Sequence, residues 1–158
     1  MKKTLIIFFL SIKSLFAIEV KCNFEEVYQN GDVQQGIFLL KGKALRYQYY
    51  DEDLYTIIAK NNYYYLVNNF NTKTVHKATE NTELIANFIE ISSDFPNIKN
   101  QYHKDGFKVK IEKSHKKFIK RISIQSDKMN LSINLINCTF DNINKKYFRP
   151  FNFEEYKR

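Results

Sequence analysis

The chain contains two cysteines, whose side chains could form a covalent disulfide bond. Cys22 and Cys138 are the only cysteines in the sequence, and in an exported protein such a pair favours a disulfide. The bond would join the first strand of the domain to a late one and close a loop spanning most of the chain. Two separate buried thiols are the alternative, because the only argument for a disulfide is the oxidising compartment that an exported protein enters.

No arrangement of side chains typical of an enzyme is present. His76, His103 and His115 lack the paired spacing of metal ligands, and the sequence contains neither a Gly-rich phosphate loop nor a Gly-x-Ser-x-Gly motif. Asp51-Glu52-Asp53 could bind a cation, but such a run is more typical of a solvated turn. We therefore predict a protein that is not an enzyme and that uses no metal and no cofactor.

The first residues have the layout of a secretory signal peptide. Lysines follow Met1, a mostly apolar stretch runs from Thr4 to Phe16, and Ala17 offers a small residue for cleavage. The apolar run is too short to span a membrane comfortably. We predict a signal peptide at residues 1–17, cleaved near Ala17, and a single periplasmic domain at residues 18–158. An uncleaved membrane anchor is the alternative.

Most of this domain has the alternating pattern of β-strands. Apolar residues alternate with polar ones, as in Phe107, Val109 and Ile111, and turns such as Asn30-Gly31-Asp32 separate the runs. A change of parity in the last run predicts a bulge near Leu135-Ile136. The pattern predicts about nine strands in an antiparallel meander, in segments 20–24, 36–41, 44–50, 54–60, 63–68, 72–77, 107–113, 118–125 and 130–140.

One stretch has the spacing of an amphipathic helix. Between Thr79 and Ser93 the apolar residues recur at helical intervals, and Pro96 prevents the helix from continuing. About nine strands are too many for a flat open sheet in a small domain, so the sheet must curl and the helix is the natural cover for its open mouth. The predicted fold is mainly β: a curved antiparallel half-barrel with a helical lid.

The order of these motifs resembles the LolA family of lipoprotein carriers. Gln35 to Tyr49 is similar to that family's Gln-Gly strand, lysine-bearing turn and aromatic strand, and Thr56 to Asn68 is similar to its next hairpin. Leu84 to Ala86 lies where the family has a helix, while Leu131 to Phe140 and Tyr147 to Phe153 follow the order of its C-terminal end. The likeness spans most of the domain, although the family's N-terminal helix has no counterpart.

The resemblance implies a function in lipoprotein transport. Proteins of this family receive the acyl chains of a lipoprotein at the inner membrane and deliver them to the outer membrane, with no nucleotide or metal. The implied partners are therefore lipidated proteins, an inner-membrane release complex and an outer-membrane acceptor. We expect the protein to act as a monomer.

A carrier of this kind needs an apolar concavity. The residues predicted to line it are Leu45, Tyr47, Tyr49, Ile57, Leu84, Ile85 and Phe88. Each of them could equally be ordinary core. Lys41, Lys43 and Arg46 could close the lid or contact an acidic partner, since the Lys41-Gly42-Lys43 turn stands where the family often has an arginine that latches the lid. Solvated lysines are the alternative.

Two other functions are compatible with the same sequence. One is a binding or adaptor protein of the cell envelope that has this fold but does not shuttle cargo. The other is a peripheral protein that binds anionic lipid headgroups through a basic hairpin. That hairpin contains Lys108, Lys110, Lys113, Lys116, Lys117, Lys120 and Arg121, with Phe107 and Phe118 between them. Such a surface can also bind nucleic acid, but export argues against that partner.

Overall fold

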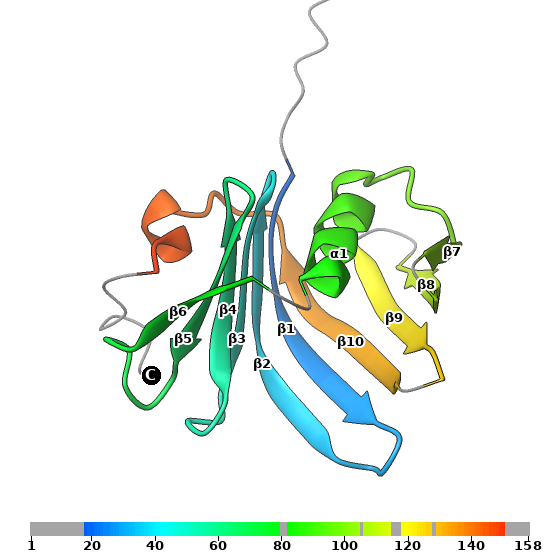
Figure 1. Ribbon diagram of the computed structural model, residues 1–158. Coiled ribbons are helices and arrows are strands. Elements are labelled where there is room, and N and C mark those ends of the chain that lie inside the picture. The colour runs from blue at the N-terminus through cyan, green and yellow to red at the C-terminus, as the bar shows by residue number, and fades with distance from the viewer. Residues whose placement is uncertain (1–17, 80–81, 105, 115–117, 128, 151–158) are drawn as a thin grey trace, which may run out of the picture.

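Ten antiparallel strands form one curved, unclosed sheet (Figure 1). The computed structural model describes residues 18–79, 82–104, 106–114, 118–127 and 129–150. The predicted signal peptide and residues 151–158 of the predicted domain lie outside the described residues. The predicted mainly β, curved antiparallel sheet with one helix is confirmed. The strands are β1 (Glu19–Tyr28), β2 (Val33–Lys41), β3 (Ala44–Tyr49), β4 (Tyr55–Lys60), β5 (Tyr63–Asn68), β6 (Val75–Ala78), β7 (Gln101–Lys104), β8 (Phe107–Lys113), β9 (Ile119–Gln125) and β10 (Asn130–Thr139).

The sheet consists of two meanders that meet in the middle. Strands β1 to β6 follow one another across one half, β7 to β10 follow one another across the other, and β1 pairs with β10 between them. The edge strands are therefore β6 and β7, which are consecutive in sequence. Because the connection between them must pass from one edge to the other, it carries α1 (Glu83–Ser93) over the concave face (Figure 1).

The disulfide lies where the two halves of the sheet meet. The predicted bond between Cys22 of β1 and Cys138 of β10 is confirmed, with a Cα–Cα distance of 4.1 Å. Beside it, β10 contains one more residue than β1, since Lys21 pairs with Thr139 but Asn23 pairs with Ile136. This is the predicted bulge. The extra residue places the Cys138 side chain on the same face of the sheet as Cys22.

The two faces of the sheet have separate cores. The larger core lies between the concave face and α1 and includes Val20, Phe24, Phe38 and Ile122, each at most 1% exposed. On the convex face, Leu39 packs against the C-terminal segment, which contains the 3-10 helix η1 (Lys145–Phe148). The sheet is therefore covered on both sides near β2 and β3, as the near-continuous apolar sequence of β2 requires.

Gly36 makes room for an aromatic stack in the larger core. It pairs with Tyr49 across β2 and β3, and a Cβ atom at this position would collide with the backbone carbonyl of Gln48 and lie 2.5 Å from the ring of Phe24. The missing side chain lets Phe24 lie against the sheet, where its ring stacks on Tyr47 with 3.9 Å between centroids.

The structure contains one strand that the sequence pattern does not predict. β7 has the sequence Gln-Tyr-His-Lys, in which Tyr102 packs against the larger core. Four residues with one aromatic side chain are too few to establish a period of two. The strand forms because it pairs with β8, which has the clear alternation that it lacks.

Candidate functional site

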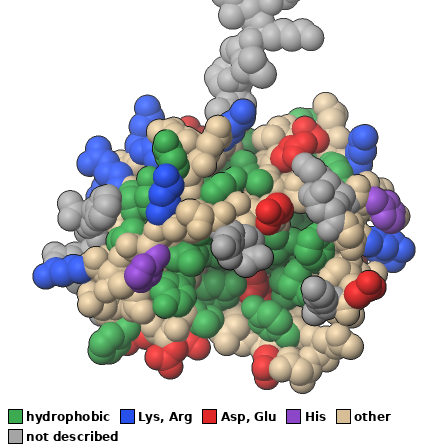
Figure 2. Space-filling view, in the orientation of Figure 1, with side chains coloured by type: hydrophobic (Ala, Val, Ile, Leu, Met, Phe, Trp, Pro, Cys, Tyr) green, Lys and Arg blue, Asp and Glu red, His purple; other side chains and the backbone are tan. Residues whose placement is uncertain are grey.

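The space between α1 and the concave face contains an apolar cavity of about 230 Å³. We call it the main cavity. It is lined by Glu26, Tyr28, Leu45, Tyr47, Tyr49, Ile57, Leu84, Ile85, Phe88, Ile124, Met129, Leu131 and Ile133. All seven residues predicted to line an acyl-binding concavity are among them. Hydrophobic side chains gather in the middle of this face of the molecule, while Lys and Arg mostly lie toward its margins (Figure 2).

Two local periodicities bring the seven residues together. Leu45, Tyr47 and Tyr49 alternate along β3 and so share one face of the sheet, and Ile57 lies directly opposite Tyr47 on β4. Leu84, Ile85 and Phe88 share one side of α1 because residues three and four apart are neighbours on a helix. The path of α1 across the sheet places these two groups opposite each other.

Burial differs between the floor of the main cavity and its rim. Leu45 and Tyr47 are only 2% and 6% exposed, whereas Tyr49, Ile57 and the three α1 residues are half-buried. The floor is therefore a fixed part of the core, and the rim consists of large side chains that keep contact with solvent.

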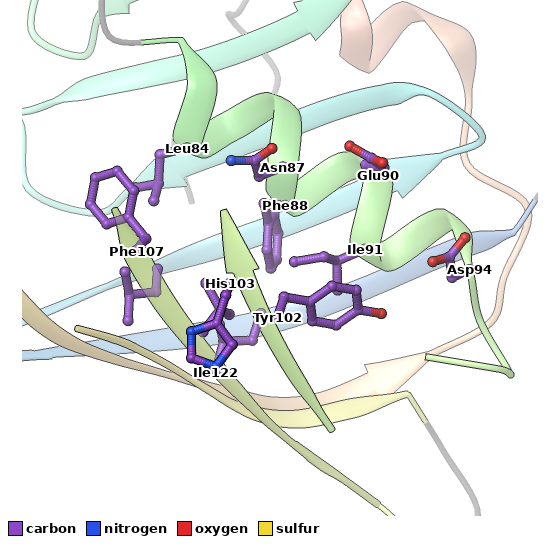
Figure 3. Close-up of a pocket in the computed structure, with 12 residues that line it drawn as sticks. Leu84, Asn87, Phe88, Glu90, Ile91, Asp94, Tyr102, His103, Phe107 and Ile122 are labelled. Atoms are coloured by element: carbon purple, nitrogen blue, oxygen red, sulfur yellow. The ribbon is translucent and has the colours of Figure 1, made fainter. Parts of the chain in front are cut away.

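Two further hollows adjoin the main cavity. A side cavity of about 110 Å³ lies between α1 and strands β7, β8 and β9, where Ile91 of the helix points toward Tyr102 and Leu84 lies beside Phe107 (Figure 3). An outer groove of about 410 Å³ shares Tyr28, Tyr49 and Ile57 with the main cavity. The main cavity alone is smaller than typical ligand pockets of roughly 300–1,000 Å³, and the outer groove falls within that range.

A buried carboxylate lies in the wall of the main cavity. Glu26 is 4% exposed and accepts hydrogen bonds from the hydroxyls of Tyr47 (2.7 Å), Tyr28 (2.6 Å) and Tyr49 (3.0 Å). We call these four residues the Glu26 cluster. Among the described residues, no lysine, arginine or histidine pairs with this carboxylate. The three hydroxyl donors therefore supply the polar contacts that a buried carboxylate requires.

Glu26 and Tyr28 are not among the residues predicted from the sequence to line the cavity. A signal was present, because the alternation of Val20, Cys22 and Phe24 continues to positions 26 and 28 and so places both side chains on the core side. An acidic residue at a core position of a strand is unusual and marks a polar contact that the fold must supply. Only the structure shows that tyrosines of β1 and β3 provide it.

The Glu26 cluster changes the acidity of its tyrosines. Burial, followed by the hydrogen bond to Glu26, raises the pKa of Tyr28 to about 12. Burial also raises the pKa values of Tyr47 and Tyr49 well above the ordinary tyrosine value, and the negative charge of Glu26 is the second cause. All three hydroxyls therefore stay protonated at neutral pH, as hydrogen-bond donors must.

These raised values predict a loss of stability in alkali. Below pH 10 the three tyrosines are protonated in the folded and the unfolded state. Above it the unfolded chain loses these protons near the ordinary pKa of 10.0, whereas the folded protein holds the proton of Tyr28 until about pH 12. Since the unfolded chain then binds fewer protons, the free energy of unfolding should fall as pH rises. Denaturant titrations at several pH values between about 9 and 11 measure this free energy of unfolding.

A matched variant checks the origin of that loss. Tyr49→Phe removes one shifted hydroxyl and should make the decrease above pH 10 less steep. Tyrosinate absorbance of the folded protein should show a group of tyrosines that ionise late among the 11 in the chain. If all of them ionised together near pH 10, the cluster would not exist as described.

The predicted lid contacts lie on the other face of the sheet. Arg46 is 1% exposed and donates to the side-chain oxygen of Gln48 (2.6 and 3.0 Å) and to the carbonyl of Tyr147 (3.2 Å). Lys41 donates to the carbonyl of Ile143 (2.7 Å) and forms an ion pair with Glu19 (2.9 Å). Both residues therefore hold the C-terminal segment against the convex face, opposite the main cavity.

Other predicted polar residues are more dispersed. Lys43 is exposed in the turn after β2. In the basic hairpin, Lys108, Lys110, Lys113 and Lys120 are exposed and Arg121 contacts Asn134 and Glu112. Lys116, Lys117 and His115 lie outside the described residues. In the part of the chain that the structure describes, no three His, Cys, Asp or Glu side chains are grouped as metal ligands.

The sequence was compared with models of known protein families and with curated proteins. Within the described ranges, no helix combines the length and the apolar composition needed to cross a bilayer. The sequence matches no model of a known protein family. A comparison with curated proteins likewise finds no match.

Proposed function

We propose that this protein is a periplasmic carrier that binds the acyl chains of lipoproteins in the main cavity and shuttles them from the inner to the outer membrane. The observation that carries the proposal is the main cavity itself. Twelve of its thirteen lining residues are aliphatic, Met, Phe or Tyr, and α1 lies over it as a lid would.

The energetics of acyl burial suit a reversible carrier. Each buried methylene contributes about 0.8 kcal/mol, so a chain of about a dozen methylenes contributes roughly 10 kcal/mol without any polar recognition. Part of this is offset by the lost freedom of the chain and by incomplete burial at the rim. A cavity with half-buried walls therefore holds a fatty tail firmly but can still release it.

The likeness to the LolA family agrees with this proposal. An open, curved antiparallel sheet with a helix over its concave face is the architecture that the resemblance implies. Strand β1 begins at Glu19, one residue after the described part of the chain begins. We propose that α1 forms the lid, and that residues 1–17 direct export to the periplasm.

The test is the capture of a lipidated peptide. Purified protein is titrated with a fluorescent peptide carrying two acyl chains and with the same peptide without them. We expect binding of the acylated peptide in the micromolar range or tighter, about −8 kcal/mol, and no measurable binding of the other. Equal binding of the two peptides would contradict the proposal.

A second measurement separates a carrier from an adaptor. Inner-membrane vesicles that contain labelled lipoproteins are incubated with the protein and sedimented. A carrier should release lipoprotein into the supernatant in proportion to the protein added. An envelope adaptor of the same fold would bind the vesicles or the lipoprotein without releasing it.

The exposed lysines of the basic hairpin favour a second candidate function. Lys108 and Lys110 alternate with the core residues Val109 and Ile111, so they share the convex face of β8. This charge could bind anionic headgroups. Binding to anionic vesicles would then weaken steeply as salt is raised, because salt screens exposed charges, whereas acyl capture would not.

A further inference from the structure

We propose that the Glu26 cluster is a headgroup site, and that the preferred ligand is an amphiphile in which a protonated amine adjoins the acyl chain. This inference rests on the proposed function in one respect: it takes the main cavity as the site of the acyl chain. The charge and geometry of the wall then identify the chemical class of the polar end.

The position of the cluster suits a headgroup. Tyr28 and Tyr49 line both the main cavity and the outer groove, so the cluster lies where the apolar cavity meets the more open one. Glu26 itself lines only the main cavity of these two. A tail lying among Leu45, Ile85 and Phe88 would thus bring its polar end to Glu26, with the outer groove leading to solvent.

The charge of the described lining residues favours a cationic head over an anionic one. The chain contains 25 Lys and Arg and has a formal net charge of +8. Even so, none of the described residues that line the main cavity or the outer groove is Lys, Arg or His, and their only charged residues are Glu26 and Asp32. Among these described residues, a carboxylate or phosphate head would meet like charge and no cation, whereas an ammonium head would meet opposite charge.

The carboxylate has room for one more donor. Its Oε2 atom accepts from Tyr28 and Tyr49, whereas among the described residues only Tyr47 donates to Oε1. Since two carboxylate oxygens offer about four acceptor positions, one position on Oε1 remains for an N–H of the ligand.

The experiment compares three probes that share one tail. Dodecylammonium, dodecanol and dodecanoate displace a fluorescent acyl probe from the purified protein at neutral pH, below their micelle-forming concentrations. A charge-assisted hydrogen bond in a desolvated site predicts that dodecylammonium binds at least about 10-fold more tightly than dodecanol, and that dodecanoate binds most weakly.

Two isosteric variants assign the preference to the cluster. Glu26→Gln should lower the affinity for dodecylammonium about 10-fold and so reduce the preference for it over dodecanol. Glu25→Gln is the matched control, because Glu25 is the adjacent residue of β1 and contacts Gln35 and Asn134 rather than the cavity. It should bind all three probes as the unaltered protein does. Thermal unfolding verifies that each variant folds.

A further variant tests the site if Glu26→Gln is poorly folded. Tyr49→Phe keeps the ring but removes one competing donor, so its preference for the amine should be retained or increased; a decrease would overturn the inference. If the three probes bind equally well, or dodecanoate binds most tightly, the headgroup site is wrong and the acyl cavity stands. If the fluorescent acyl probe itself does not bind, the proposed function fails.

Discussion

Replacing Cys22 and Cys138 with serine should lower the free energy of unfolding by about 4–5 kcal/mol. The bond links residues separated by 116 positions, so its loss restores much of the chain entropy of the unfolded state. It also joins β1 to β10, the one pairing that connects the two meanders. Domains of this kind are stable by only about 5–15 kcal/mol. Denaturant unfolding monitored by circular dichroism measures the loss.

The reduced protein is the control for lost packing. It keeps both sulfur atoms but lacks the bond, so its midpoint should lie close to that of the double serine variant. Reduction could instead change the free energy of unfolding by less than about 1 kcal/mol while the serine variant loses several kcal/mol. In that case the packing of the sulfur atoms, and not the crosslink, would be the source of stability.

Replacing Phe88 with glutamate should weaken the binding of an acylated peptide at least about 100-fold. Phe88 lines both the main and the side cavity and packs edge-on against Phe38 with 5.2 Å between ring centroids. A carboxylate here would lie in an apolar cavity that already contains Glu26, so an acyl chain could enter only by desolvating it. Titration with the fluorescent peptide measures the change.

Phe70→Glu is the matched control. Phe70 is 73% exposed and lines none of the three hollows, so the same substitution there should change the affinity less than about twofold. Equal losses in the two variants would place acyl binding elsewhere. Because Phe88 is half-buried, thermal unfolding of both variants is measured alongside, and Phe88→Trp tests the cavity by filling it.

Much of the cavity wall could be predicted because its residues are adjacent in a local pattern. Leu45, Tyr47 and Tyr49 follow the period of a strand, and Leu84, Ile85 and Phe88 follow that of a helix. The prediction did not include the opposite wall of the cavity, which contains Leu131 and Ile133 of β10. These residues follow a period of two just as clearly, but alternation within a strand does not indicate which distant strand pairs with β1.

Arg46 illustrates the limit of reasoning from sequence. Its alternation with Leu45 and Tyr47 places it on the face opposite the cavity, and an arginine on that face is ordinarily solvated. Instead it is almost fully buried, because the C-terminal segment returns to cover it and Tyr147 offers a backbone carbonyl. That segment has no clear period, so nothing near Arg46 in the sequence predicts its cover.

The sequence by itself determined the type of each main element and the face on which its apolar residues lie, because both depend on side-chain spacing over a few residues. Only the tertiary structure decided that β10 pairs with β1, that α1 therefore crosses the concave face, and that Glu26 meets three tyrosine hydroxyls. These contacts join residues brought together by strand pairing and chain reversal. Their energies depend on neighbours that no local pattern specifies.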